Sequence, residues 1–130
     1  MAWHNDLGRE GEEAACQYLE SQGLCVINRN WHCGKLELDI VARKPDENLL
    51  HFVEVRTRSK QNETRFGYSA AESVTMTKQR RIANAAMGYM RYYNLNMGVE
   101  FDIVAVHYNA GQFEIEWLRD VFIPQLKTYR

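Results

Sequence analysis

The 130-residue sequence lacks a long hydrophobic run, and its first residues lack the pattern expected of a signal peptide. Because no run of about 18 apolar residues occurs, we expect no transmembrane helix. The first residues contain neither a basic segment nor an apolar one, which argues against a signal peptide, so a cytoplasmic location is expected. The length and the charged fraction of 25% are typical of one globular domain, predicted to span residues 1–130.

Cysteine is also scarce, with only Cys16, Cys25 and Cys33. An odd number of cysteines without a CxxC spacing argues against a disulfide framework and against a zinc cluster. Cys25, His32 and Cys33 could supply metal ligands, but a fourth partner is not apparent. We interpret the three cysteines as small buried thiols in a reducing compartment.

An overall charge of one sign is absent as well, since the formal net charge is −1. The charge is nevertheless unevenly distributed: +6 over residues 56–91, against −5 over residues 1–55 and −2 over residues 92–130. A basic middle block in a nearly neutral protein indicates one electropositive face. That face is either a solvated loop and helix surface or a surface that binds phosphate groups.

Hydrophobic periodicity and turn residues predict two helices and five strands. The first helix is expected to begin at a cap formed by Asn5 or Asp6 and to end near Gln22, and the second to run from about Thr75 or Thr77 to about Tyr93. The predicted strands are 24–27, 36–42, 49–57, 100–107 and 112–118, with a polar connection at 28–34 and an irregular segment at 59–73. This order, α-β-β-β-α-β-β, predicts an α/β fold with a central mixed sheet flanked by helices.

Charged side chains occur in the two predicted strands that form a hairpin. Because residues two apart on a strand point the same way, Glu37 and Asp39 share one face, and Glu54 and Arg56 share a face of the next strand. Glu12, at the start of the apolar stripe of the first helix, points inward and could join them. The opposite face of the first strand is predicted to carry Leu36, Leu38 and Ile40.

Such a cluster of carboxylates predicts a metal site. Neighbouring carboxylates repel one another, and partial burial raises the cost of their charge unless a cation lies among them. Oxygen ligands without His or Cys favour Mg²⁺ or Mn²⁺, which can activate water for the hydrolysis of a phosphodiester. The alternative is structural: ion pairs of Glu54 with Arg56, or of Asp39 with Arg58, would need no bound ion.

Several motifs carry a family resemblance along most of the chain. They are GREGE at 8–12, ELDIVA at 37–42, FVEVRTR at 52–58, VT…KQRR at 74–81 and FDIV at 101–104. Together they resemble the YraN-like family, small bacterial proteins of the restriction-endonuclease-like (PD-(D/E)xK) nuclease superfamily. The resemblance implies an αβββαβ core, with Asp39 and Glu54 as the two metal-binding acids and Glu12 as a further acid from the first helix. It also implies Glu37 as a neighbouring acid and Gln79 as a polar residue from the second helix.

One position departs from the superfamily signature. Arg56 stands where that signature has lysine, and an arginine stays protonated, so it cannot act as a general base. It can still stabilise charge that develops on a phosphate. The residues expected to bind a nucleic-acid backbone are Arg58, Lys60, Arg65, Lys78, Arg80 and Arg81.

The sequence thus favours an Mg²⁺-dependent nuclease acting on single-stranded or branched DNA, for which a two-fold homodimer would be suited. One alternative is a nucleic-acid-binding module that keeps the nuclease fold without its chemistry, and Arg56 is the main support for it. Another is an accessory protein that binds a partner protein through exposed aromatic residues, taken from Trp3, Trp31, Tyr92 and Tyr93.

Overall fold

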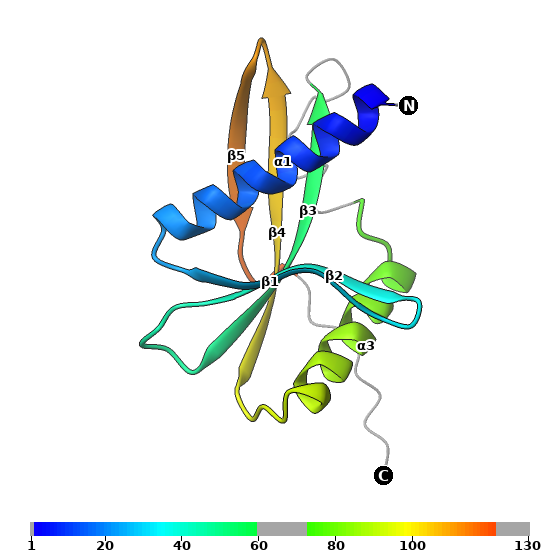
Figure 1. Ribbon diagram of the computed structural model, residues 1–130, viewed down its shortest axis with the longest axis vertical. Helices are drawn as coiled ribbons and strands as arrows, with labels where there is room; N and C mark the ends of the chain where they lie inside the picture. The colour runs from blue at the N-terminus through cyan, green and yellow to red at the C-terminus, as the bar shows by residue number, and fades with distance from the viewer. Residues whose placement is uncertain (1, 60–72, 122–130) are drawn as a thin grey trace.

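Two helices and five strands make up the computed structural model, which describes residues 2–59 and 73–121, with side chains from residue 6 onward (Figure 1). The helices are α1 (Ala2–Ser21) and α3 (Met76–Tyr92). The strands are β1 (Cys25–Cys33), β2 (Leu36–Arg43), β3 (Leu49–Ser59), β4 (Gly98–Asn109) and β5 (Gln112–Leu118). The predicted α/β class and element order are confirmed, and the order is consistent with a restriction-endonuclease-like core.

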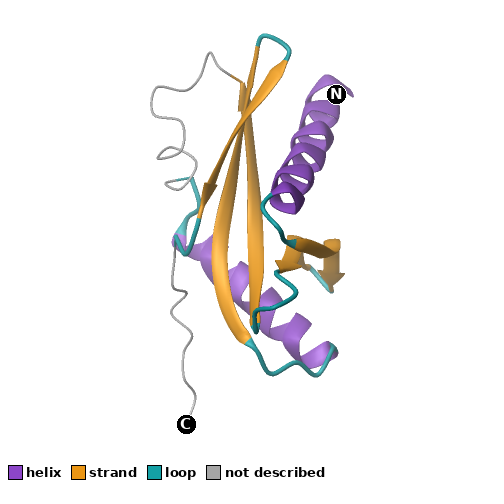
Figure 2. Ribbon diagram, turned by 90° about the vertical axis from the view of Figure 1, so that its left-hand side faces the viewer, coloured by secondary structure: helices purple, strands orange, loops and turns teal. Residues whose placement is uncertain are grey.

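The five strands form one mixed sheet in the order β1-β2-β3-β4-β5. All neighbouring pairs are antiparallel except β3 and β4, which run parallel and are connected through α3. The β1–β2 hairpin crosses the other strands, of which β3 and β4 are the long ones, at a steep angle, so the sheet is strongly twisted (Figure 1). Figure 2 shows this hairpin and α1 on the same side of the long strands.

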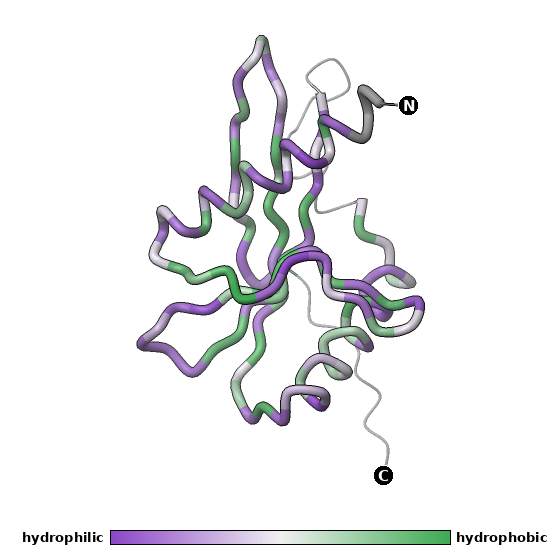
Figure 3. Tube along the Cα trace, viewed as in Figure 1, coloured by the Kyte–Doolittle hydropathy of each residue, from purple (hydrophilic) through white to green (hydrophobic). Residues whose placement is uncertain are grey.

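Hydrophobic side chains pack on both faces of the sheet. The face covered by α1 buries Ala15, Cys16, Leu19, Ile40, Val53 and Val104. The face covered by α3 buries Phe52, Ile82, Ala86, Tyr89, Phe101 and Ile103. Along the strands and along α1, hydrophobic and hydrophilic stretches alternate (Figure 3), which is the pattern expected of elements with one packed side. Each fully buried large side chain contributes roughly 1.5–3 kcal/mol, so the two clusters hold both helices on the sheet.

The predicted start of the first helix is wrong, and so is the predicted connection at 28–34. The helix α1 begins at Ala2, and the Asp6 carboxylate accepts a hydrogen bond from Arg9 one turn further along instead of capping the helix. The segment expected to be a connection continues strand β1 to Cys33, because it pairs with β2 as far as Cys33 and Leu36. An edge strand tolerates such polar residues, so pairing overrides local composition there. Of the segment 59–73, only its two ends lie within the described residues.

The face prediction for β2 is also wrong in one respect. Leu38 packs in the cluster under α3, whereas Ile40 packs in the cluster under α1. The strict alternation breaks at Asp39, because the pairing of β2 with β3 is recorded only from Ile40 to Ala42. Beyond Ile40 the strand β2 leaves β3 and follows the twisted hairpin over α3, which carries Leu38 to the other side.

The prediction of three buried thiols is confirmed for only one of them. Cys16 is buried under α1, whereas Cys25 and Cys33 are exposed because they lie at the two ends of the edge strand β1. Neither helix within residues 2–59 and 73–121 has the length and apolar character needed to span a membrane.

Candidate active site

The site forms where β2 separates from β3. The last recorded pair on this side joins Ile40 to Val53, and the next residue of β2 is Asp39. Its carboxylate oxygen Oδ2 accepts a hydrogen bond of 2.9 Å from the backbone N–H of Val55. The Asp39 side chain thus provides the acceptor for the Val55 N–H at the point where β2 no longer pairs with β3. The two strands therefore separate without leaving this backbone donor unpaired.

The carboxyl groups of Asp39 and Glu54 lie side by side at this opening. Glu54 is buried, with 9% of its surface exposed, and Asp39 is half-buried. Burial, with the charge of Glu54 as the next largest cause, raises the pKa of Asp39 to about 7, and a hydrogen bond between the two side chains adds to the shift. The Val55 N–H opposes this rise. At neutral pH the pair therefore carries less than its full negative charge in the absence of a bound cation.

Two basic side chains approach Glu54 from different elements. The ammonium Nζ of Lys78, in the first turns of α3, lies 3.4 Å from Oε2 of Glu54. The guanidinium Nε of Arg56, two residues along β3, lies 3.7 Å from the same oxygen. The other end of the Arg56 side chain donates a hydrogen bond of 3.4 Å to the backbone carbonyl of Ser73.

A cavity of about 390 Å³ opens over the two acids between the β1–β2 hairpin, β3 and α3. Among the described residues, its lining consists of Lys35, Glu37, Asp39, Glu54, Lys78, Arg81 and Ile82. Three carboxylates therefore face three basic side chains around one solvent-accessible space. Glu37 is exposed at its rim, where His32 approaches it to 3.6 Å.

The chain is fixed by hydrogen bonds just before α3. The hydroxyl of Thr75 caps the helix by accepting the Lys78 N–H at 3.2 Å. The side-chain amide of Gln79 donates to the carbonyl of Val74 at 3.1 Å, so Gln79 holds the turn and is not among the cavity-lining residues. These contacts and the Arg56–Ser73 bond set the position of the first turn, and with it that of Lys78.

Glu12 lies near the acid pair but has partners of its own. Its carboxylate accepts a hydrogen bond of 2.9 Å from the side chain of Asn30 and lies 3.7 Å from the guanidinium of Arg29. Its charge contributes to the raised pKa of Asp39, so the two carboxylates are within electrostatic reach. Glu12 is, however, not among the described residues that line the cavity.

Of the predicted backbone-binding residues, Lys78 and Arg81 line the described part of the cavity. Arg80 and Arg81 are exposed on α3, and Arg81 donates a hydrogen bond of 3.3 Å to the carbonyl of Lys35 in the β1–β2 turn. Arg58 is half-buried near the end of β3. Lys60 and Arg65 lie outside the described residues. The described helix α3 contains four basic residues and no acidic one, which makes its surface electropositive.

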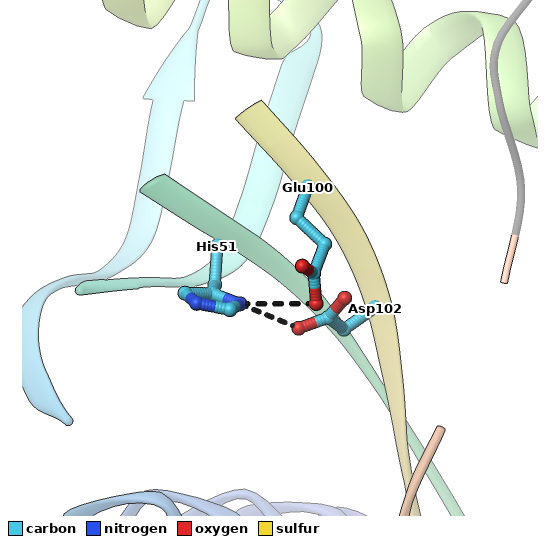
Figure 4. Close-up of side chains that lie close together, drawn as sticks. All are labelled: His51, Glu100 and Asp102. Atoms are coloured by element: carbon cyan, nitrogen blue, oxygen red, sulfur yellow. Dashed lines mark hydrogen bonds and ion pairs between the residues drawn. The ribbon is translucent and has the colours of Figure 1, made fainter. Parts of the chain in front are cut away.

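A second polar cluster lies on the opposite face of the sheet, and sequence reasoning missed it. His51 on β3 and Asp102 on β4 are both fully buried, and Nδ1 of His51 lies 2.8 Å from Oδ2 of Asp102 (Figure 4). Glu100 also approaches the His51 ring, at 3.4 Å. The available signal was a polar residue with apolar neighbours on both sides, His51 in LLHFV and Asp102 in FDIV.

Hydrogen bonds already occupy the carboxylates of this second cluster. Asp102 accepts from the indole N–H of Trp117 at 3.0 Å and from the backbone N–H of Asp120 at 2.9 Å. Burial raises the pKa of Asp102, and the hydrogen bond with His51 opposes that rise. Burial also disfavours the charge of Glu100, but two hydrogen bonds from Arg119, at 2.8 and 2.9 Å, make the net change in its pKa a lowering.

His51, Glu100 and Asp102 place ligand atoms within 4.8 Å of one another, so the cluster is compatible with a cation. The carboxylates already accept hydrogen bonds from protein donors, so these contacts account for the burial of the acids without one. Nε2 of His51, in contrast, is buried without a hydrogen-bond partner among the described residues. We interpret it as a structural network that ties the end of β5 to β3 and β4.

The fold and the site together define the class of protein: an α/β domain with a mixed five-stranded sheet and an acidic cavity where two strands separate. The model of uncharacterised protein family UPF0102 matches residues 11–106, so the chain belongs to this family, and the predicted YraN-like resemblance is confirmed. A UPF0102 protein of Bacteroides thetaiotaomicron is 44% identical over 97% of this chain and 99% of its own. One from Phocaeicola vulgatus is 41% identical over the same shares, and one from Nitrosococcus oceani is 39% identical over 93% of this chain and 94% of its own.

Proposed function

We propose that this protein is a metal-dependent nuclease that hydrolyses phosphodiester bonds in DNA, on single-stranded or branched substrates. The observation that carries the proposal is the pair formed by Asp39 and Glu54 in a cavity that basic side chains surround. Membership in a family without an established activity neither supports nor opposes this function.

The acid pair fits a divalent cation by its chemistry. Burial and mutual repulsion raise the pKa of Asp39, so a positive ion between the two groups would relieve an unfavourable charge arrangement. The donors are carboxylate oxygens, and Mg²⁺ or Mn²⁺ prefers such ligands. Asp39 and Glu54 would hold the ion, and Glu12 would add negative charge from outside the cavity lining.

A bound ion of this kind supplies Lewis acidity, which polarises a phosphodiester and lowers the pKa of coordinated water. The protein's own residues orient the metal ligands and bind the substrate. The Val55 N–H orients the Asp39 carboxylate, and Arg81 in the cavity lining and the exposed Arg80 beside it on α3 would bind backbone phosphates. Bound dimers would place two cavities on one branched substrate.

One observation favours a second candidate function. Arg56 occupies the signature's lysine position, and it is absent from the described lining of the cavity. If this position is essential for catalysis, the protein would bind nucleic acid through the basic surface of α3 without cleaving it. Such binding would be strongly salt-dependent.

A cleavage assay tests the proposal. Purified protein is incubated with duplex, single-stranded and four-way-junction DNA in Mg²⁺, Mn²⁺ or EDTA. We expect products only with a metal, and a loss of at least about 100-fold in rate for Asp39→Asn and for Glu54→Gln. The control is Glu114→Gln, which removes an exposed carboxylate on β5 and should cleave at the wild-type rate. No product with any metal, combined with a salt-sensitive gel shift, would favour the binding module.

A further inference from the structure

We infer that Lys78 of α3, and not Arg56 of β3, presents the positive charge that stabilises the reacting phosphate. This inference rests on the proposed nuclease function and assigns a catalytic residue to the same site. In the superfamily signature, a lysine two positions after the second acid has this role. Here we assign the role to a lysine on a different element of the fold.

Lys78 has the position that this role requires. Its Nζ lies 3.4 Å from Glu54, and its side chain lines the same cavity as Asp39. The side chain is 44% exposed, so the ammonium group faces both the acid pair and the space that a substrate would enter. A phosphate held over the two acids would therefore contact Lys78 without any rearrangement of the fold.

Arg56 has a different environment. Its side chain is only 23% exposed, and its terminal nitrogen is used by the backbone carbonyl of Ser73. Its Nε lies 3.7 Å from Glu54, and the residue does not belong to the described lining of the cavity. The guanidinium therefore connects β3 to the residues just before α3, and we assign it a positioning role.

Three contacts fix the helix turn that carries Lys78. Its backbone N–H is bound by the Thr75 hydroxyl at 3.2 Å, and the backbone N–H of Gln79 donates to the Thr75 carbonyl at 2.8 Å. The Gln79 amide closes the turn on Val74. A cation on the anchored first turn of a helix is a preorganised group, which loses little on reorganisation when charge develops nearby.

The reaction itself adds one water molecule across a phosphodiester bond. The water oxygen forms a new bond to phosphorus, the bond between phosphorus and the leaving oxygen breaks, and one water proton ends on the leaving oxygen. Negative charge builds on the non-bridging oxygens during the displacement, and these are the atoms that the Lys78 ammonium would contact.

Single-turnover cleavage by four variants tests the inference. Lys78→Met should lower kcat by about 10²–10³-fold, the usual effect of removing one preorganised charge donor. Lys78→Arg keeps the charge and should recover at least about a tenth of the wild-type rate. Arg56→Gln shortens the side chain and loses the Ser73 contact, so this change at a positioning residue should lower kcat by less than about tenfold, well short of the Lys78→Met effect. Arg91→Gln, exposed in the last turn of α3 and away from the cavity lining, is the control and should stay within about threefold of wild type in kcat and KM.

A second measurement does not depend on cleavage. The binding of a fluorescent single-stranded oligonucleotide is followed in Ca²⁺, with circular dichroism to confirm folding. We expect Lys78→Met to weaken Ca²⁺-dependent binding about tenfold and Arg56→Gln to weaken it less than Lys78→Met does.

The outcomes distinguish a failure of the Lys78 assignment from a failure of the proposed nuclease function. If Lys78→Met cleaves and binds like wild type while Glu54→Gln is inactive, the nuclease stands and the Lys78 assignment is overturned. If Arg56→Gln loses activity and Lys78→Met does not, the signature position is the catalytic one. If wild-type protein neither cleaves nor binds the oligonucleotide, the proposed function and this inference both fail.

Discussion

The Asp39 carboxyl group accepts a hydrogen bond of 2.9 Å from the Val55 N–H and lies beside the Glu54 carboxyl group. The first contact favours its charged form, and the second, together with burial, disfavours it more strongly. The result is a group that titrates near neutral pH, at the point where β2 leaves β3. The position of the Asp39 carboxyl group and its raised pKa therefore both depend on the separation of β2 from β3.

Asp39→Asn should make the stability of the protein less dependent on pH. The folded-state pKa of about 7 lies above the unfolded value of 3.8, so the folded state takes up the proton more readily. Stability from this group is fully present below about pH 4 and is lost as the pH rises through 7. At pH 8 the variant should be more stable by about 1–2 kcal/mol, a figure discounted because the group is half-exposed.

Urea unfolding at pH 4 and at pH 8 measures this difference. The wild type and the variant should unfold at the same urea concentration at pH 4 and separate at pH 8. Glu37→Gln, which alters the exposed acid at the rim, is the control and should follow the wild type at both pH values. An Asp39→Asn variant that is less stable than wild type at pH 8 would show that its charge is stabilised in the fold.

Mg²⁺ should stabilise the folded protein, and more strongly at pH 8 than at pH 6. A ligand that binds only the folded state raises the melting temperature with its concentration. A proton on Asp39 competes with the metal, so the apparent affinity should fall up to about tenfold per pH unit below the pKa. Thermal melts with increasing Mg²⁺ measure the effect. Asp39→Asn should lose it, whereas equal Mg²⁺ stabilisation of the variant would place the ion elsewhere.

Gly11→Ala should destabilise the protein, because this glycine lets α1 approach β3. A Cβ atom at position 11 would lie 2.2 Å from the hydroxyl oxygen of Thr57 and 3.0 Å from its Cβ. The second contact involves an atom that rotation of the side chain cannot remove, so the helix itself must shift. We expect a loss of about 1–3 kcal/mol in the free energy of unfolding.

Gly8→Ala is the matched control for that substitution. A Cβ at Gly8 meets no atom within 4 Å, and the same helix should gain about 0.5–1 kcal/mol from the better helix former. Thr57→Ala removes the two closest contacts and should partly restore Gly11→Ala, which a double-mutant cycle detects. Equal effects of both glycine substitutions would mean that the packing contact is unimportant.

Much of this architecture could be predicted from the sequence because its periodicity is strong. The strand β5 was predicted with its observed bounds, and the second helix was predicted to begin near Thr75 or Thr77, where the structure places the cap at Thr75. The 28–34 segment failed because its strand structure depends on pairing with β2, which polar composition does not reveal.

The site was only partly predictable for a similar reason. Spacing placed Asp39 and Glu54 on compatible faces, but spacing cannot show that Arg56 turns to Ser73 while Lys78 enters the cavity. That distinction depends on how α3 sits over the sheet. His51 and Asp102 lie far apart in sequence, and their pairing comes from the parallel β3–β4 register.

Asp102→Asn should destabilise the fold without impairing cleavage by the molecules that remain folded. The buried carboxylate binds His51, Trp117 and the Asp120 N–H, and a neutral amide weakens each of these bonds. We expect a loss of about 2–5 kcal/mol in the free energy of unfolding, measured in urea by far-UV circular dichroism. Glu114→Gln, an exposed substitution on β5, should change it by less than about 0.5 kcal/mol.

The network and the acid pair lie on opposite faces of the sheet, so the cleavage rate per folded molecule should stay within about threefold of wild type. A loss of cleavage by fully folded Asp102→Asn protein would instead assign the network a role in the chemistry.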